Sequence, residues 1–297
     1  MSQSLLIALL AGLGGMLGWG FADFFAKKTI DSIGDVASLA WAGVFGTIGF
    51  LIVAGVELAR GNTLTFPHDL ATWAILSFFG VLQAAVYLFV YRAFSKGQVS
   101  LLNPVFASFS GIVSLVSILF LGEMVGPLKL LILAILFIGV MLLNIDVTAL
   151  RSARIMFVQI PGFTEIVIAT ALAAIWTIGW DIFVNGKDWL PATSIMFFAM
   201  TVTAFVAAMI GRTPLAVGSK RLWIFLALVG LSETLAFAAI SIGYSMTSLT
   251  SIVALVSGGF SLPTVILARI YLHEKTTSIQ SLGIGTIILG VLLLPLV

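Results

Sequence analysis

Ten stretches of about 20 mostly apolar residues follow one another along the chain, separated by short breaks that carry charges, proline, glycine or asparagine. A helix of about that length spans the hydrocarbon core of a bilayer. Only 9% of the 297 residues are charged, against about 25% in a typical soluble domain. We therefore predict an all-α membrane protein with ten transmembrane helices. The expected spans are 5–25, 36–58, 70–91, 99–121, 128–144, 165–183, 189–210, 223–244, 249–270 and 278–296.

The remaining composition excludes several kinds of site. The net charge of +2 is spread over short loops without a basic run, so nucleic acid is not an expected partner. The absence of cysteine excludes disulfides, iron–sulfur sites and thiol catalysis. His68 and His273 lie far apart and predict no metal site. We expect no cofactor and no catalytic residue, and we expect the chain to act as a monomer.

The distribution of lysine and arginine predicts the orientation in the membrane, because cytoplasmic loops carry an excess of both. Eleven of the 14 lie in odd-numbered loops: Lys27, Lys28, Arg92, Lys96, Arg151, Arg154, Arg212, Lys220, Arg221, Arg269 and Lys275. The even-numbered loops carry Arg60, Lys129 and Lys187. Both termini are therefore expected on the outside face of a bacterial-type plasma (inner) membrane. Arg92 and Arg269 lie at helix ends and could snorkel toward either face.

The two halves of the sequence resemble each other. Residues 119–143 align with 270–294, so that Glu123 matches Glu274, at a place where a turn or cap role is expected, and both segments end in -GV-LL. Further upstream, Gly80, Gln83, Tyr87, Tyr91 and Phe94 match Gly230, Glu233, Phe237, Ser241 and Tyr244. Because five helices per repeat is an odd number, the second copy must run antiparallel to the first. We predict a first repeat at 1–146, a connecting loop at 147–164 and a second repeat at 165–297, within one membrane unit. The alternative to a repeat is that two Leu- and Gly-rich sequences have come to resemble each other by convergence.

Three features carry a resemblance to a known family. They are the segment YRAFSKGQVSLLNPVFASFSGIVSLVSILFLGE, the GE or HE step after the fourth and ninth helices, and the closing -GV-LL pattern. Together they resemble the EamA-type carriers of the drug/metabolite transporter superfamily, over the whole chain as two copies. The resemblance implies ten helices, a central cavity between the halves and movement of small metabolites, often outward. The prolines depart from the repeat, since Pro104 matches Leu255 and Pro263 matches Ile112.

One face of the eighth helix carries the principal candidate for substrate binding. Glu233 lies about ten residues from either end of its span, where a carboxylate costs about 2.5 kcal/mol or more, so it should face a cavity or a partner. Stripes of matching spacing on helices three and eight predict the opposed walls of a cavity. Glu233 would supply a charge or a proton site, Gln83 a neutral hydrogen-bonding counterpart, and the aromatic residues a stacking or cation–π surface. The alternative is a protonated Glu233 that serves packing, with aromatic residues that only fill space. The expected substrate-binding residues are Glu233, Gln83, Tyr87, Tyr91, Phe237, Tyr244, Asn103 and Ser241.

Further candidates lie on helices one, four, six and nine. Asn103 is expected to face the pathway, whereas the small and hydroxylated residues near it permit close helix packing. The prolines should kink helices four and nine and could serve as hinges. Asp23 and Asp181 each follow a tryptophan near a helix end, which would suit gates at opposite faces. Alternatively, they are ordinary interfacial acids, with Lys27 pairing Asp23. The expected gating residues are Asp23, Trp19, Asp181, Trp180, Pro104 and Pro263.

These features favour a secondary membrane transporter that exports a small organic metabolite by alternating access. The deep acid favours an amino acid, an amine or an organic cation, and Glu233 could also couple transport to protons. The cavity is expected between helices three, four, eight and nine. An uncoupled facilitative carrier for nucleosides or other neutral metabolites is the alternative, followed by a non-transporting membrane scaffold. An intramembrane enzyme acting on lipids would need a nucleophile–base or metal constellation that the sequence does not present.

Overall fold

The computed structural model describes residues 2–96, 99–145, 161–271, 273 and 276–296. Every regular element in these ranges is helical, and ten helices long and apolar enough to cross a membrane are present, as predicted. The helices are α1 (Gln3–Ile33), α2 (Asp35–Ala59), α3 (Leu70–Lys96), α4 (Val99–Ala107), α5 (Phe109–Phe120), α6 (Pro127–Asn144), α8 (Phe163–Val184), α9 (Trp189–Ile210), α10 (Lys220–Met246), α11 (Thr250–Gly258), α12 (Ser261–Tyr271), α13 (Ser278–Leu293) and η2 (Leu294–Leu296).

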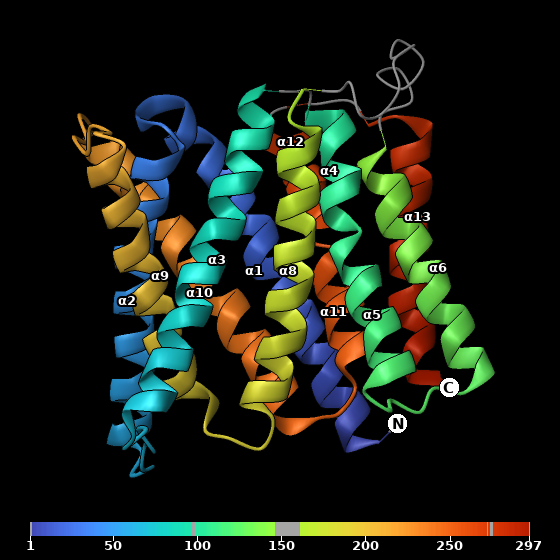
Figure 1. Cartoon of the computed structure of the whole chain (residues 1–297). Coiled ribbons are helices and arrows are strands. Elements are labelled where there is room, and N and C mark those ends of the chain that lie inside the picture. Colours follow the sequence, from blue (N-terminus) through green and yellow to red (C-terminus); the bar gives the residue numbers. More distant parts are fainter. Residues whose placement is uncertain (1, 97–98, 146–160, 272, 274–275, 297) are drawn as a thin grey trace.

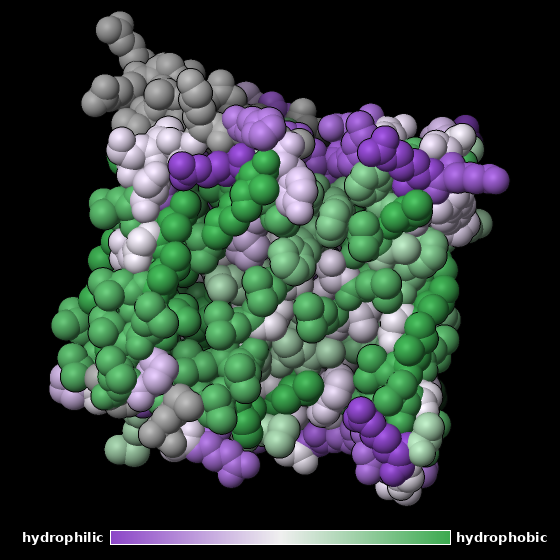
Figure 2. Space-filling view, turned by 180° about the vertical axis from the view of Figure 1, so that it is seen from behind, coloured by the Kyte–Doolittle hydropathy of each residue, from purple (hydrophilic) through white to green (hydrophobic). Residues whose placement is uncertain are grey.

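The helices stand side by side, and both termini lie at the same end of the bundle (Figure 1). On the face shown in Figure 2, a broad apolar belt crosses the middle of the molecule, and hydrophilic residues gather at both ends. Large apolar side chains on the membrane spans, such as Leu51, Phe78 and Leu119, are more than half exposed. Such a surface requires lipid around it, and helices satisfy their own backbone groups there. The prediction of an all-α integral membrane protein is confirmed.

The first helix is longer than the sequence predicted. α1 continues to Ile33, beyond the expected end at residue 25, so Lys27 and Lys28 lie on the helix and not in a loop. The chain turns only at Gly34, whose φ of 83° is a conformation that favours glycine, and whose N–H bonds to the Ile30 carbonyl. The length of the apolar stretch therefore predicted the membrane span of α1, whereas the end of the helix lies at the next residue that can turn the chain, Gly34.

Spans four and nine each consist of two helical segments, as the prolines predicted. Pro104 lies inside α4, and the Ser108 N–H after it is shared between the carbonyls of Pro104 and Val105, at 3.2 and 3.3 Å. In span nine, α11 ends at Gly258 and α12 begins at Ser261, two residues before Pro263. Proline has no N–H and obstructs the preceding turn, which explains the interruption before Pro263. The interruption in span four lies after Pro104, where the Ser108 N–H still bonds to the Pro104 carbonyl.

The main contacts between the two halves occur in equivalent pairs. In such a pair, the contact between two helices is repeated by the counterparts of those helices in the other repeat. α1 packs on α10, and its counterpart α8 packs on α3. Likewise α3 packs on α9 while α10 packs on α2, and α6 packs on its own counterpart α13 (Figure 1). This arrangement is that of two inverted five-helix repeats. The bounds 1–146, 147–164 and 165–297 stay a prediction, and α8 begins two residues before the expected start of the second repeat.

Equivalent glycines allow the closest of these contacts, and they give a first testable prediction. A Cβ added to Gly230 would overlap the Ala42 carbonyl on α2, and one added to Gly80 would overlap the Met196 carbonyl on α9. We expect Gly230→Ala to lower the midpoint of thermal unfolding in detergent by about 3–8 °C, because a packed backbone cannot yield without strain. Gly285→Ala adds a Cβ that meets nothing within 4 Å and should leave the midpoint unchanged or slightly raised. Equal midpoints for the two variants would contradict the close contact.

Candidate functional site

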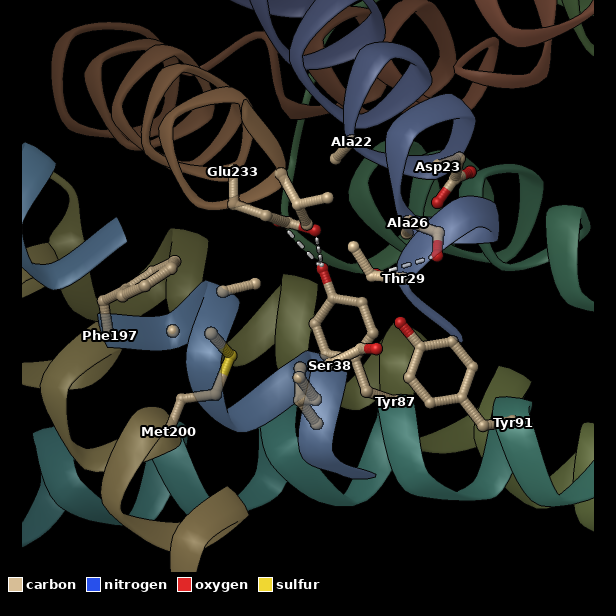
Figure 3. A pocket seen from close by; sticks show the side chains of 14 residues that line it. Ala22, Asp23, Ala26, Thr29, Ser38, Tyr87, Tyr91, Phe197, Met200 and Glu233 are labelled. Atoms are coloured by element: carbon tan, nitrogen blue, oxygen red, sulfur yellow. Dashed lines mark hydrogen bonds between the residues drawn. The ribbon is translucent and has the colours of Figure 1, made fainter. Parts of the chain in front are cut away.

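A narrow pocket lies between α1, α2, α3, α9 and α10 (Figure 3). Its lining includes residues of the last turns of α1 and the first turns of α2, on either side of the first loop. Its polar lining consists of Asp23, Thr29, Ser38, Tyr87, Tyr91 and Glu233. The cavity volume of about 20 Å³ suffices for a water molecule but not for an organic solute. The helices are therefore closed around the site in this conformation.

Glu233 extends into this pocket from the middle of α10 and is 9% exposed. The Tyr87 hydroxyl on α3 donates toward both of its carboxylate oxygens, at 2.9 Å each (Figure 3). The Trp19 side chain lies against the same carboxyl group. Among the described residues that line the pocket there is no lysine or arginine. A deep carboxyl group in such surroundings can receive a proton or a positively charged group.

The lining of the pocket adds a second carboxyl group and further hydroxyls. Asp23 of α1 is exposed there, and the Tyr91 ring packs against Tyr87 at 6.1 Å. The Ser38 hydroxyl is buried and has no hydrogen-bond partner in the described part of the chain. The Thr29 hydroxyl donates to the carbonyl one turn back. Neither hydroxyl was predicted from the sequence, because residues of this kind beside helix ends look the same as ordinary caps.

A group of five aromatic side chains lies next to Glu233, toward the opposite end of the bundle. Phe237, one turn further along α10, is fully buried and contacts the rings of Trp19, Trp176 and Phe197, with centroids at 5.7, 5.7 and 5.5 Å. Trp176 in turn stacks on Trp180 at 5.6 Å. We call these five residues the aromatic cluster. Of the five, Phe197 lines the pocket, whereas Phe237 and Trp180 lie outside its lining.

The inverted repeat explains why the two predicted stripes do not face each other across one cavity. α3 and α10 run in opposite directions through the membrane, so positions that follow Gln83 and Glu233 in sequence move toward opposite ends. Tyr87 and Tyr91 therefore reach the pocket, whereas Ser241 and Tyr244 are buried on the other side of the aromatic cluster. The Ser241 hydroxyl accepts a hydrogen bond from the Trp180 indole at 3.0 Å. Gln83 is buried and lies outside the pocket lining.

Asn103 lies in a different polar group, near the interruptions of spans four and nine. Its amide donates to the Asn144 side-chain oxygen at 2.5 Å, and the Ser261 hydroxyl donates to the same oxygen at 2.8 Å. These bonds connect α4, α6 and α12 close to Pro104 and Pro263. The pocket is lined by α1, α2, α3, α9 and α10. Spans four (α4 and α5) and nine (α11 and α12) do not line it, contrary to the expectation from the sequence. Those two spans instead pack on each other through small residues.

Asp181 lies at the opposite end of the bundle from Asp23 and lines a second, wider cleft. Glu123 reaches the same cleft and accepts the Ser251 N–H, in the first turn of α11, at 2.9 Å. Glu123 thus has the expected capping role, but for a helix of the other repeat. Glu274, Lys275, Arg151 and Arg154 lie outside the described residues.

Comparison with known proteins agrees with this architecture. The model of the EamA-like transporter family matches residues 6–145 and 161–296, one copy for each repeat. A solved structure titled "Crystal structure of protein" superposes with a TM-score of 0.77 over 97% of this chain and 96% of that chain, at 15% sequence identity, and so shares the fold. No curated protein matches the sequence. The chain therefore belongs to the EamA-like transporter family, and it is an integral membrane transporter.

Proposed function

We propose that the protein is a secondary carrier that exports a small organic solute bearing an ammonium or other cationic group. Glu233 is the observation that carries this proposal. It is a carboxyl group in the middle of a membrane span, 9% exposed, facing a pocket with no basic side chain among the described lining residues. An ionised carboxylate at this depth needs a compensating partner. The Tyr87 hydroxyl supplies one donor, and a bound ammonium group would supply the charge.

The position of Asp23 supports the same class of solute and an outward direction. This second carboxyl group is exposed and lines the pocket, where it would raise the local concentration of cations. The pocket lies toward the end of the bundle that carries most of the lysine and arginine residues, which is the expected cytoplasmic face. A cationic solute entering from the cytoplasm would pass Asp23 before it reaches Glu233.

Alternating access requires the closed pocket to widen on one side at a time. A volume of about 20 Å³ excludes an organic solute, so binding must separate the helices that surround Glu233. The aromatic cluster is the proposed barrier toward the other face, and the interruptions of spans four and nine are the proposed hinges. We keep gating roles for the residues that carry these features: Asp23, Trp19, Asp181, Trp180, Pro104 and Pro263.

Glu233 also offers a place for a coupling proton. A solute cation and a proton that compete for one carboxylate cannot occupy it together, so export of one would favour return of the other. The carrier would then act as a proton antiporter. The same pocket without such competition would serve uncoupled transport.

A binding screen tests the proposed solute class. Purified protein in detergent is heated with amino acids, polyamines, quaternary amines or nucleosides, and the shift in unfolding midpoint is measured. Amine-bearing solutes are expected to stabilise the protein, because a ligand that binds only the folded state raises its stability. Counterflow of the same solute in proteoliposomes then separates a carrier from a scaffold. Stabilisation by neutral solutes alone would overturn the proposed role of Glu233 as an ammonium partner.

The hydroxyl groups of the pocket support a second candidate, an uncoupled carrier for neutral metabolites such as nucleosides. Thr29, Ser38, Tyr87 and Tyr91 all line the cavity, and hydroxyls can bind a polar neutral solute through hydrogen bonds. Glu233 would then stay protonated. This candidate is distinguished by transport that persists in Glu233→Gln and does not respond to a pH gradient.

A further inference from the structure

The second cleft is lined by residues at the ends of α5 and α8 and at the start of α11, and none of them lines the pocket at Glu233. Both termini lie at this end of the bundle (Figure 1). The cleft has a volume of about 650 Å³ and lies between α5, α8 and the loops that lead into α6 and α11. Asp181 and Glu123 line it, and they are only 6% and 7% exposed. Within the described chain, no lysine, arginine or histidine lines this cleft. Its charged lining is therefore acidic.

Two consecutive residues at the start of α11 hold both carboxyl groups. The Thr250 hydroxyl donates to Asp181 Oδ2 at 2.8 Å. Ser251 donates its backbone N–H and its hydroxyl to the two oxygens of Glu123, at 2.9 and 2.5 Å. The Ser117 hydroxyl adds a third bond to Glu123, at 2.6 Å. Because Thr250 and Ser251 are adjacent, the two carboxyl groups are neighbours, and each oxygen of Glu123 has a donor.

Asp181 is the incomplete member of this pair. Its Oδ1 is buried and has no hydrogen-bond partner in the described ranges. Lys187, the nearest basic residue along the chain, instead donates to the Phe183 carbonyl and lies over the Phe183 ring. Glu123 already occupies the Ser251 N–H at the positive end of α11. A buried carboxylate oxygen without a donor is costly, and a bound cation would remove that cost.

We propose that this cleft is a binding site for a monovalent cation, with Asp181 as its principal ligand. The Thr250 hydroxyl oxygen and the Glu123 carboxylate would add further oxygen atoms. The positive charge would come from an inorganic ion such as Na⁺ or from the ammonium group of an organic solute. The site lies on the other side of the aromatic cluster from Glu233, and it does not depend on the solute class proposed for that pocket.

Equilibrium binding of radiolabelled sodium and of radiolabelled methylammonium to the purified full-length protein tests the site. Binding is measured in the Glu233→Gln background, which removes the charge of the deep carboxyl group in the first pocket, while Asp23 of that pocket is the same in every variant compared. Adding Asp181→Asn should weaken binding at least about tenfold, because asparagine keeps the acceptor for Thr250 but removes the charge. Adding Asn185→Asp, at an exposed position that lines the cleft, should tighten binding about threefold.

Competition between the two labels identifies the source of the charge. Sodium binding that methylammonium does not displace supports an inorganic ion, and binding of methylammonium alone supports an amine. Absence of binding of both cations in the Glu233→Gln background would overturn the assignment. Binding unchanged by both Asp181→Asn and Asn185→Asp would also overturn it. Failure of the carrier function appears separately, as absence of solute counterflow, and leaves this binding measurement unaffected.

Discussion

Glu233→Gln is expected to abolish specific binding and transport of the cationic solute. Glutamine has nearly the same shape and still accepts a hydrogen bond from Tyr87, so the local packing is kept while the negative charge is lost. Removing one partner of a buried charge pair costs about 2–5 kcal/mol. The solute Kd should therefore rise at least about 30-fold, since 1.4 kcal/mol corresponds to a factor of ten. Calorimetric binding and counterflow in proteoliposomes measure the two effects.

Tyr87→Phe is the matched control for this substitution. It removes the hydroxyl that donates to Glu233 and keeps the charge, so we expect a change in affinity of only about tenfold or less. Transport driven by a pH gradient should persist in Tyr87→Phe and disappear in Glu233→Gln if Glu233 carries the coupling proton. Full uptake by Glu233→Gln without any dependence on the gradient would contradict both roles and favour the carrier for neutral solutes.

Phe237→Ala is expected to destabilise the protein and to open a leak across it. Phe237 is fully buried and joins α10 to aromatic residues of α1, α8 and α9. Removal of a buried phenylalanine costs about 3–5 kcal/mol, which corresponds to a fall of roughly 6–12 °C or more in the unfolding midpoint. The missing ring also thins the barrier between the pocket at Glu233 and the opposite cleft. Solute should then leave preloaded proteoliposomes down its gradient faster than with the wild-type protein.

Phe198→Ala separates these effects from a general loss of aromatic surface. Phe198 lies beside the buried Phe197 on α9, but its own side chain is 57% exposed on the lipid-facing surface. Its removal should leave the unfolding midpoint within about 2 °C and leave passive efflux unchanged. Equal midpoints and equal efflux rates for Phe198→Ala and Phe237→Ala would contradict the barrier role of the aromatic cluster.

The membrane architecture could be predicted from the sequence because its signals are local. Each of the ten apolar stretches is long enough to span the bilayer. The alignment of 119–143 with 270–294 indicates two copies of an odd number of helices. Pro263 likewise marks the interruption before it through its own covalent structure. The end of α1 was less predictable, because a helix in the interface continues until a residue such as Gly34 turns the chain.

The candidate site was predictable only in part. Glu233 stood out because a carboxyl group deep in a span is costly anywhere in lipid. Its partner was less visible, since Tyr87 was one of several aromatic residues on an equivalent stripe of the other repeat. Asn103 also looked suited to the pathway, yet it bonds to Asn144 in a separate polar group. Residue type and spacing define the face of a helix but not the element that packs against it.

The sequence by itself determined which residues face one side of each helix, because helical periodicity is a property of the chain. Only the tertiary structure decided where those faces meet. It placed α1, α2 and α9 around Glu233, and it held Asp181 and Glu123 together through the start of α11. These contacts join residues separated by tens of positions or more in the sequence. They depend on the depth and direction of each span in the inverted packing, which no local pattern of residues encodes.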